Sequence, residues 1–432
     1  MGLVVMKFGG SSVADAGRIK SAAARAIATQ RAGHRVVMVV SAMGDTTDHL
    51  VDLAGQVNPD PPKREMDQLM ATGEQVTISL MAMALEEQGA GAISFTAAQI
   101  GMVTDEVHTK ARIKSIEVRR IHEQLSRGRV VVIAGFQGVT SEGAVTTLGR
   151  GRVVVVAGFQ GVTEDGAVTT LGRGGSNVTL VAIAAALKAD VCENYTDVDG
   201  IYTADPRVVP NARKIDKISY DEMLELSSLG ASVLHNRAVE FAKKYDVPIH
   251  VRNAANRRKG TMIVAETQDM ERIVVSGAAM KDKLARVTLK GVPNRPGAAA
   301  RVFHTMAVHK IVVDDIIQTI PDTKSAVIAF TVDMGDLSDA KKAVGKLCQL
   351  LHCTAVFEDH LAKVSVVGVG MRVHTGVAER MFAALAKAGV NIENITTSEI
   401  RISCLINRDQ GKKALRVVHD AFGLGRGPTK AG

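Results

Sequence analysis

The sequence predicts an α/β sandwich followed by two small α+β modules. In residues 3–264, short Val- and Ile-rich runs alternate with longer amphipathic stretches, which is the pattern of a sheet covered by helices. After residue 266 the order strand, helix, strand, strand occurs twice, and a helix closes each copy. Two tandem modules are therefore expected after the sandwich.

The individual elements follow from the same periodicity. In the first region, strands are expected at residues 3–8, 35–41 and 152–158, and helices at 13–31, 65–88 and 178–187. The first module is expected to use strands at 285–289, 311–319 and 326–332 and a helix at 297–309. The second repeats this with strands at 363–368, 390–398 and 401–406 and a helix at 376–388. The predicted domains are residues 1–265, 266–350 and 351–432.

Composition excludes several classes of protein. The 432 residues are 46% hydrophobic and 23% charged, as in ordinary globular domains rather than disordered or fibrous chains. The chain lacks Trp and is 3% aromatic, which argues against a nucleic-acid binder that stacks bases on exposed rings. The net charge of +8 is spread along the sequence, so it indicates either a solvated surface or attraction of anionic small molecules.

Two further features bear on the compartment. No apolar run approaches the roughly 18 residues of a membrane span, and residues 1–8 resemble a buried strand more than a secretory signal. We therefore expect a cytoplasmic protein with no membrane partner. None of the four cysteines has CxxC spacing, so we expect free buried thiols rather than disulfides or a zinc site at Cys192, Cys348, Cys353 and Cys404.

Residues 128–150 and 151–173 form a near-identical direct repeat. They align without gaps and differ at Ile133/Val156, Ser141/Glu164 and Glu142/Asp165. A repeat architecture needs about three or more stacked units, so two copies indicate a recent duplication or an artefact of cloning or assembly. Only the second copy runs directly into the segment 174–177. We therefore expect the second copy to hold the native place and the first to be displaced.

A glycine turn closes the first predicted strand. The segment Met6-Lys7-Phe8-Gly9-Gly10-Ser11-Ser12 precedes a predicted helix, and glycines at such a junction let backbone N–H groups turn toward phosphate oxygens. Lys7 would place an ammonium group against the charge that builds on a transferring phosphoryl group. A tight structural turn is the alternative, and the segment does not have the spacing of a Walker P-loop.

A second glycine cluster also connects a strand to a helix, in Leu171-Gly172-Arg173-Gly174-Gly175-Ser176-Asn177. Two glycine-lined helix starts in one domain suggest that they face an ATP γ-phosphate from two sides. Arg173 suits a carboxylate, because its guanidinium fork matches two carboxylate oxygens. A surface charge is the alternative for Arg173.

Other polar segments lie between and after the glycine clusters. The carboxylate of Glu74 suits a substrate ammonium group and the hydroxyl of Thr47 suits a carboxylate, although each alone is also typical of a helix cap or a solvated side chain. Residues 195–207 combine turn residues with acids, an aromatic ring and an arginine. Such a segment suits the sugar, base and phosphates of a nucleotide, and a surface hairpin is its alternative.

Together these segments resemble one family. KFGGSS, VSAMGDTTD, ATGE, AGFQG, TTLGRGGS and YTDVDGIYTADPR occur in the order seen in aspartate kinases, over nearly the whole chain. VPNRPG at 292–297 and TTSEIRIS at 396–403 are similar to the paired ACT domains of that family's monofunctional branch. The resemblance implies an amino acid kinase-like three-layer sandwich followed by two ACT-like βαββαβ modules.

The resemblance also implies roles for individual residues. The catalytic set would be Lys7, Asn177 and Arg173. Aspartate would be held by Ser41, Thr47, Glu74 and Arg173. The nucleotide would be held by Lys7, Gly9, Gly10, Ser11, Gly174, Gly175, Thr196, Asp197, Tyr202, Asp205, Arg207 and Ser232. No residue is expected to ligate a metal, so Mg²⁺ would enter with ATP.

In the modules, the helix that starts near residue 297 would take the carboxylate of an amino-acid effector. The residues expected to contact the effector are Asn294, Gly297, Ala298, Gln318 and Asn391.

Three features depart from the family. Asn177 stands where the family usually has Asp, Ser232 stands where many relatives carry a nucleotide-binding Lys, and the direct repeat is surplus. The first departure is tolerable chemically, because a substrate carboxylate with a pKa of about 3.9 is already ionised at neutral pH. No general base is needed for the transfer.

The expected function is Mg²⁺- and ATP-dependent phosphorylation of the side-chain carboxylate of L-aspartate, with feedback by lysine, threonine or both. The resemblance implies a homo-oligomer joined through the ACT modules, with or without a shorter C-terminal subunit. A catalytically weakened amino-acid sensor or partner subunit is the alternative, favoured by Asn177 and the repeat. A kinase for another carboxylate, such as N-acetylglutamate, is disfavoured by Glu74 and the paired modules.

Overall fold

The chain folds into two compact units. The computed structural model describes residues 2–126, 130–133, 152–157, 160–163, 167–171, 174–230, 233–271, 273–321 and 323–426. The first unit comprises Met1–Ile201, Lys214–Ser227 and Ser232–Thr267, and the second comprises Tyr202–Arg213, Ser228–Ala231 and Gln268–Gly432. Part of the predicted nucleotide segment is therefore grouped with the second unit.

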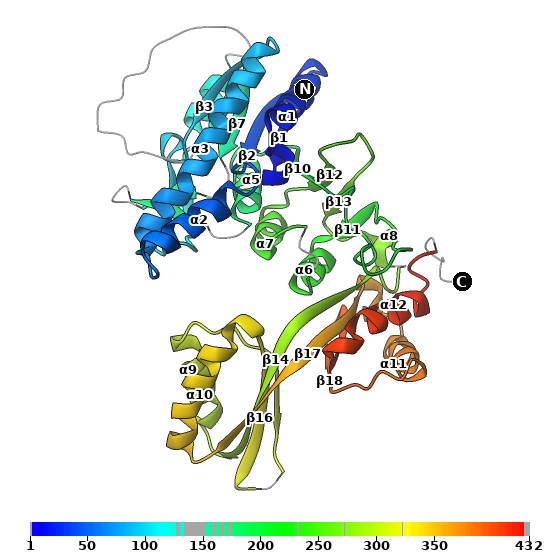
Figure 1. Ribbon diagram of the computed structural model, residues 1–432. Helices are drawn as coiled ribbons and strands as arrows, with labels where there is room; N and C mark the ends of the chain where they lie inside the picture. Colours follow the sequence, from blue (N-terminus) through cyan, green and yellow to red (C-terminus); the bar gives the residue numbers. More distant parts are fainter. Residues whose placement is uncertain are drawn as a thin grey trace. The chain divides into compact units, whose positions relative to one another are not determined.

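A largely parallel sheet forms the centre of the first unit (Figure 1). In the described residues its spatial order is β11 (Lys217–Ser219), β13 (Thr261–Val264), β12 (Ile249–Asn253), β10 (Val191–Thr196), β1 (Leu3–Phe8), β2 (Arg35–Val40), β6 (Val130–Ile133), β3 (Gly91–Phe95) and β7 (Arg152–Ala157). The helices of this unit are α1 (Ala16–Arg31), α2 (Thr46–Val57), α3 (Lys63–Glu87), α4 (Arg119–Ser126), α5 (Gly175–Ala186), α6 (Tyr220–Ser228) and α7 (Asn236–Tyr245).

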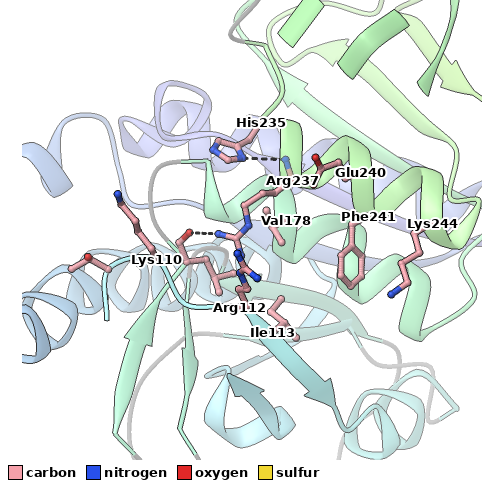
Figure 2. A pocket seen from close by; sticks show the side chains of 11 residues that line it. Lys110, Arg112, Ile113, Val178, His235, Arg237, Glu240, Phe241 and Lys244 are labelled. Atoms are coloured by element: carbon pink, nitrogen blue, oxygen red, sulfur yellow. Dashed lines mark hydrogen bonds between the residues drawn. The ribbon is translucent and has the colours of Figure 1, made fainter. Parts of the chain in front are cut away.

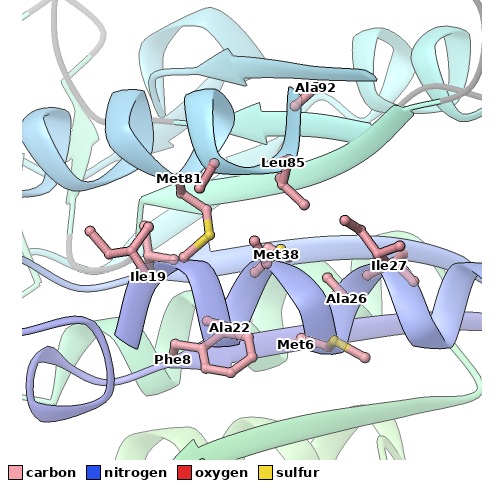
Figure 3. Close-up of a cluster of buried hydrophobic side chains, with 14 of the residues drawn as sticks. Met6, Phe8, Ile19, Ala22, Ala26, Ile27, Met38, Met81, Leu85 and Ala92 are labelled. Atoms are coloured by element: carbon pink, nitrogen blue, oxygen red, sulfur yellow. The ribbon is translucent and has the colours of Figure 1, made fainter. Parts of the chain in front are cut away.

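Side-chain alternation along β1 divides the unit into layers. Met6 and Phe8 face a core made with α1 and α3, in which Met38, Met81 and Leu85 are also buried (Figure 3). The intervening residues of β1 point to the opposite face, where α5 packs on the strands and α7 packs on α5. The result is the predicted three-layer sandwich.

A smaller sheet in the first unit contains the hairpin that precedes α4. Its order in the described residues is β5 (Ile113–Ile116), β4 (Met102–Thr104), β8 (Gln160–Val162) and β9 (Val168–Thr170). β9 ends immediately before the second glycine cluster. The hairpin loop between β4 and β5 bonds to this end, since the Ala111 amide donates to the Thr170 carbonyl at 2.9 Å.

The two copies of the direct repeat supply strands with equivalent partners. β6 from the first copy and β7 from the second both register with β2 and β3, and Val131 is aligned with its repeat counterpart Val154. β3 pairs with β7 along its whole length, from Gly91↔Arg152 to Phe95↔Val156, but with β6 only at Ala92 and Ile93. The strands β6 and β7 therefore occupy equivalent positions next to β2 and β3, and β7, from the second copy, makes the longer pairing.

The second unit is built on an antiparallel sheet. Its order in the described residues is β15 (Asp314–Thr319), β16 (Ser325–Asp333), β14 (Gly277–Pro293), β17 (Thr354–Val367), β19 (Arg401–Asn407) and β18 (Asn394–Thr397). Its helices are α8 (Gln268–Glu271), α9 (Ala298–Val308), α10 (Leu337–Leu351), α11 (Val377–Lys387) and α12 (Gly411–Ala421).

Two hydrophobic cores divide this sheet between two modules. The first core joins one half of β14, from Ala285 to Val292, to α9 and α10. The second core joins Ala278 at the other end of β14 to α11, α12 and the second half of β17. β14 and β17 thus run through both modules, because each is long enough to pair at both ends. The boundaries of the two modules in the sequence, 266–350 and 351–432, stay a prediction.

The element types predicted from periodicity are confirmed, with differences in length. The helix expected at 65–88 is α3, and the strand expected at 363–368 is the end of the much longer β17. All four cysteines are free thiols, and Cys348 is less buried than expected. No helix in the described ranges is long and apolar enough to cross a bilayer.

Candidate active site

Parallel pairing brings three predicted segments to one edge of the sheet. Lys7, near the end of β1, is in register with Val39 of β2 and Asn194 of β10. The loops that leave these strands carry the first glycine turn, Ser41 and the pair Thr196–Asp197. In open α/β sheets, ligands bind at the carboxyl ends of the strands. This edge is therefore the candidate active site.

Lys7 is a buried cation at this edge. Its side chain lies on the α5 face of the sheet, opposite the core-facing Met6 and Phe8, and the residue is only 9% exposed. Burial lowers the pKa of Lys7 to about 8, and the negative charge of Asp197 acts in the opposite direction. The ammonium group therefore stays charged at neutral pH, where it can neutralise phosphate charge.

The first glycine turn packs closely against the loop after β2. A Cβ atom on Gly10 would lie 2.9 Å from the Ala42 carbonyl oxygen and 3.0 Å from that of Gly44, so this approach requires glycine. The Gly44 amide also donates to the Gly10 carbonyl at 3.1 Å. The two loops therefore form one surface.

Ser41 and Glu74 lie on this surface, as the sequence predicts. The Ser41 hydroxyl donates to Ser176 Oγ at 3.0 Å, which links the first loop to the start of α5. Glu74 of α3 is 3% exposed and accepts a hydrogen bond from the Ala42 amide at 3.2 Å. Thr47 is half-buried in the first turn of α2. Ser176 was not among the predicted site residues.

Two buried asparagines lack partners at this edge. Within the described part of the chain, Asn177 Oδ1 and both amide atoms of Asn194 make no hydrogen bond. The residues are 8% and 1% exposed. An unpaired buried polar group costs about 1–3 kcal/mol, so these atoms are candidate hydrogen-bonding positions of the site. Sequence reasoning missed Asn194, whose only signal was a polar residue inside an apolar strand.

The remaining predicted site residues are not all described within the first unit. Arg173 and Ser232 lie outside the described residues. Tyr202, Asp205 and Arg207 are grouped with the second unit. There, Arg207 Nη2 lies 2.8 Å from Asp205 Oδ2, and hydrogen bonding from Arg207 holds the pKa of Asp205 below its usual value.

A cavity of about 970 Å³ lies beside the second glycine cluster (Figure 2). Its charged lining residues are mainly basic, with Lys110, Arg112, Arg237 and Lys244 against the single carboxylate of Glu240. The side chain of Arg237 extends from α7 toward the segment of Lys110 and Arg112 (Figure 2). None of the predicted site residues lines this cavity.

Each predicted effector residue lies in the second unit. Gly297, with φ of +88°, caps the N-terminus of α9, and Ala298 is the buried first residue of that helix. Asn294 bonds to the loop before β16, since its amide donates to the Lys324 carbonyl at 2.9 Å. Gln318 is exposed on β15, and Asn391 is exposed just before β18.

Metal ligands of the protein itself are not evident. No group of three or more His, Cys, Asp or Glu side chains that could hold a metal occurs in the described ranges. ATP phosphates are themselves the principal ligands of Mg²⁺ in phosphoryl-transfer sites.

Comparison with known proteins agrees with this architecture. Residues 2–152 and 145–253 match the amino acid kinase family, and residues 286–352 and 364–422 match ACT domains. The chain is 46% identical over 432 residues to an aspartokinase of Bacillus sp. (strain MGA3), covering 100% of both chains.

Two solved structures are also similar. E. coli aspartokinase III in complex with aspartate and ADP has a TM-score of 0.79 and 25% identity, with 97% of this chain and 99% of that chain covered. The same enzyme in complex with lysine and aspartate has a TM-score of 0.71 at the same identity and coverage. The chain therefore belongs to the aspartokinase family, in the monofunctional form that joins one amino acid kinase domain to two ACT domains.

Proposed function

We propose that this chain transfers the γ-phosphoryl group of Mg²⁺-bound ATP to the side-chain carboxylate of L-aspartate, giving 4-phospho-L-aspartate. The observation that carries the proposal is the buried Lys7 ammonium at the carboxyl edge of the sheet, next to Asp197 and the first glycine turn. The E. coli relative binds aspartate and ADP, which supports the same pair of substrates here.

The roles follow from charge and position. The substrate carboxylate is an ionised nucleophile at neutral pH, so the protein must align it and neutralise phosphate charge. Lys7, the N–H groups of Gly9, Gly10 and Ser11, and the start of α5 at Gly174 and Gly175 would hold the phosphates. Bound Mg²⁺ would offset the remaining phosphate charge.

Aspartate would lie between α3 and the start of α5. Glu74 would hold its ammonium group, and Ser41, Thr47 and Arg173 its carboxylates. Thr196, Asp197, Tyr202, Asp205, Arg207 and Ser232 are proposed for the nucleotide, and Asn177 for aligning the reacting groups.

A coupled assay of ADP release, together with trapping of the acyl phosphate as hydroxamate, tests this function. Wild type should form both products only when aspartate and ATP are present. Lys7→Ala should remain folded and lose nearly all turnover, because Lys7 meets charge that grows in the transition state. The matched control is Lys20→Ala, whose side chain is exposed in a surface ion pair with Glu87. Unchanged turnover in Lys7→Ala would refute the assigned site.

A second function is favoured by the unpaired Asn177 Oδ1. If the amide has replaced a carboxylate needed for transfer, the chain would serve as a catalytically weakened sensor or partner subunit. Such a protein would bind lysine or threonine in calorimetry while showing no hydroxamate formation. Turnover by wild type excludes this alternative.

We also propose feedback by lysine, threonine or both at the second unit. The relative that binds lysine with aspartate supports an effector of this chemistry. The N-terminus of α9 near Asn294, Gly297 and Ala298 has no side-chain cap in the described residues and suits a carboxylate, and Gln318 and Asn391 offer amide groups.

The second unit is also proposed to join two copies of the chain, alone or with a shorter C-terminal subunit. β15 and β18 are edge strands, each paired on one side in the described residues. Ile316 on β15, Ile320 immediately after β15 and Ile395 on β18 are 53%, 58% and 44% exposed. Pairing between copies would cover these edges and apolar side chains. Sedimentation should show a dimer or larger species that Ile316→Lys weakens.

Two further assignments remain proposals. The domain limits 1–265, 266–350 and 351–432 agree in order with the family matches. The four free thiols suit a reducing compartment such as the cytoplasm.

A further inference from the structure

We infer that Asp67 and Arg237 are positioning residues that hold the stem of the second glycine cluster from two sides. The stem is defined as Thr170, the last residue of β9, and Leu171, the first residue of the cluster. The hairpin loop is defined as residues 108–112, between β4 and β5. The inference rests on the proposed function, because the cluster is assigned there to the reacting groups.

Asp67 bonds to both the stem and the hairpin loop. It is a fully buried residue of α3, and its carboxylate accepts from the Thr109 amide at 3.0 and 3.1 Å and from the Thr170 hydroxyl. Nδ1 of His108 lies 2.9 Å from Oδ2. A buried carboxylate is tolerated only when donors surround it. These donors come from two segments distant in sequence, so Asp67 joins them.

Thr109 shows that this contact imposes a specific backbone shape. Its φ of +67° is in the left-handed region, which a β-branched residue rarely adopts. The amide of this residue is the one that donates to both oxygens of Asp67. Such conformations persist where the surroundings over-determine them, and the Asp67 carboxylate supplies that constraint.

Arg237 joins the same two segments from α7. Its guanidinium donates to the Leu171 carbonyl at 3.0 Å and to the Ala111 carbonyl at 2.9 Å. A backbone hydrogen bond from the Ala111 amide to the Thr170 carbonyl joins the hairpin loop to the stem directly. Figure 2 shows Arg237 reaching from α7 to the hairpin segment of Lys110 and Arg112. Asp67 and Arg237 therefore hold one stem through separate atoms.

Gly174, near the other end of the cluster, packs against the N-terminus of α7, the helix that carries Arg237. Gly174 has φ of +77°, and a Cβ there would lie 2.6 Å from Cβ of His235, two residues before Arg237. Ser176 then bonds to Ser41. Asp67 and Glu74 are seven residues apart on α3 and so share one face. The contacts thus set the positions of the stem and of the start of α5 relative to Glu74, the proposed partner of the substrate ammonium.

The expected effect falls on aspartate more than on ATP, because the contacts fix the stem relative to Glu74, whereas Lys7 and the first glycine turn also hold the phosphates. Asp67→Asn keeps the size of the side chain but removes the charge that attracts the Thr109 amide and the Thr170 hydroxyl. A displacement of about 1 Å in a reacting group can cost about 100-fold in rate. We expect kcat/KM for aspartate to fall 10- to 100-fold, with KM for ATP within about twofold of wild type. Arg237→Met should act alike, and Arg237→Lys should recover part of the loss.

Matched controls separate positioning from general damage. Glu117→Gln makes the same acid-to-amide change just after β5, where Glu117 is exposed and forms an ion pair with Arg119. Lys243→Met removes a surface contact with Asp221 from the same helix as Arg237. Both controls should leave the ratio of the two KM values unchanged. The double variant Asp67→Asn/Arg237→Met should lose less than the product of the single losses, because both residues hold one stem.

Hydrogen exchange provides a readout that does not need turnover. Peptides covering 104–116 and 167–171 should exchange faster in Asp67→Asn and Arg237→Met, while peptides from β1 and β2 should match wild type. If wild type fails to phosphorylate aspartate, the proposed function fails and exchange still tests the contacts. If Asp67→Asn does not fold, the comparison of Arg237→Met with Arg237→Lys tests the inference instead. Folded variants with unchanged exchange, or with equal changes in both KM values, would overturn the inference.

Discussion

The Thr203 hydroxyl lies 3.0 Å from Nε2 of His419, and both residues are buried in the second unit. Thr203 belongs to the segment Tyr202–Arg213 of the second unit, which contains the proposed nucleotide residues Tyr202, Asp205 and Arg207. His419 belongs to α12. The Arg416 guanidinium of the same helix donates to the Val208 carbonyl at 2.8 Å. The last helix of the regulatory region therefore directly supports a proposed part of the nucleotide site.

This contact predicts loss of stability in acid. Burial lowers the pKa of His419, although Asp420 acts in the opposite direction. The unfolded state therefore binds a proton first, so the contribution of neutral His419 is complete above its unfolded pKa of about 6.5 and is lost as pH falls below it. The slope cannot exceed about 1.4 kcal/mol per pH unit for one group.

Thermal unfolding of wild type and His419→Gln between pH 7.5 and 5.5 measures this effect. Burial also lowers the pKa of His235 and His250, so both proteins should lose stability in acid. Wild type should lose more. Parallel pH profiles for the two proteins would show that His419 does not contribute.

The lowered pKa of Lys7 predicts an alkaline limit to catalysis. Because this pKa is about 8 in the free protein, kcat/KM for ATP should fall above that pH as the ammonium loses its proton. Bound phosphates favour the charged form, so the limb in kcat should lie at higher pH. Lys7→Arg, whose charge persists across this range, should lose the limb even if its rate is low. A limb unchanged in Lys7→Arg would assign it to another group.

Asn177→Asp should raise activity. A hydrogen bond to a charged partner contributes roughly 1.5–3 kcal/mol, which corresponds to roughly 10- to 150-fold in rate. Single-turnover measurements at saturating ATP and aspartate would isolate the chemical step. Asn194→Asp is a useful comparison, because Asn194 is also buried and unpaired. A flat or lower rate in Asn177→Asp would indicate that the site has adapted to the amide.

Deletion of residues 128–150 should preserve or improve activity and raise solubility. β6 and β7 register with the same neighbours, and only β7 pairs along the whole of β3. Removing the first copy ends this competition and removes a Val-rich strand that can pair with other chains. Soluble yield and thermal unfolding should be measured for wild type and for the deletion variant. An unfolded deletion variant would show that the first copy is structural.

Truncation near residue 266 should abolish inhibition by lysine or threonine, and the structure predicts a further loss. Ala204, Val208 and Val209 are buried in the core of the second ACT module, so truncation would expose them and release the proposed nucleotide segment. KM for ATP should therefore rise. Calorimetry of the full chain with lysine and threonine, singly and together at millimolar concentration, tests effector binding. No heat in any combination would refute the regulatory proposal.

Much of the fold was predictable because its signals are local. Val-rich runs and the period of α1 and α3 predicted the sandwich, and the βαββ order predicted the modules. The lengths of β14 and β17 were not predictable, because each strand is defined by partners in both modules. The position of Tyr202–Arg213 depends likewise on contacts more than 200 residues away in sequence.

The site was predictable where glycine and hydroxyl residues cluster, as at Gly10 and Ser41. Asp67 was missed, although its spacing of seven from Glu74 places both on one face of a helix. Arg237 carried no comparable signal, because its partners are backbone carbonyls, which any sequence provides.

The strands β14 and β17 also constrain how this region can be inherited. β14 and β17 each contribute one end to the first ACT module and the other end to the second. Recombination between the modules would therefore leave both hydrophobic cores incomplete. A breakpoint before β14 would instead carry the pair as a whole. The two ACT modules of this chain should therefore be exchanged between proteins only as a pair, because either one alone would lack part of its core.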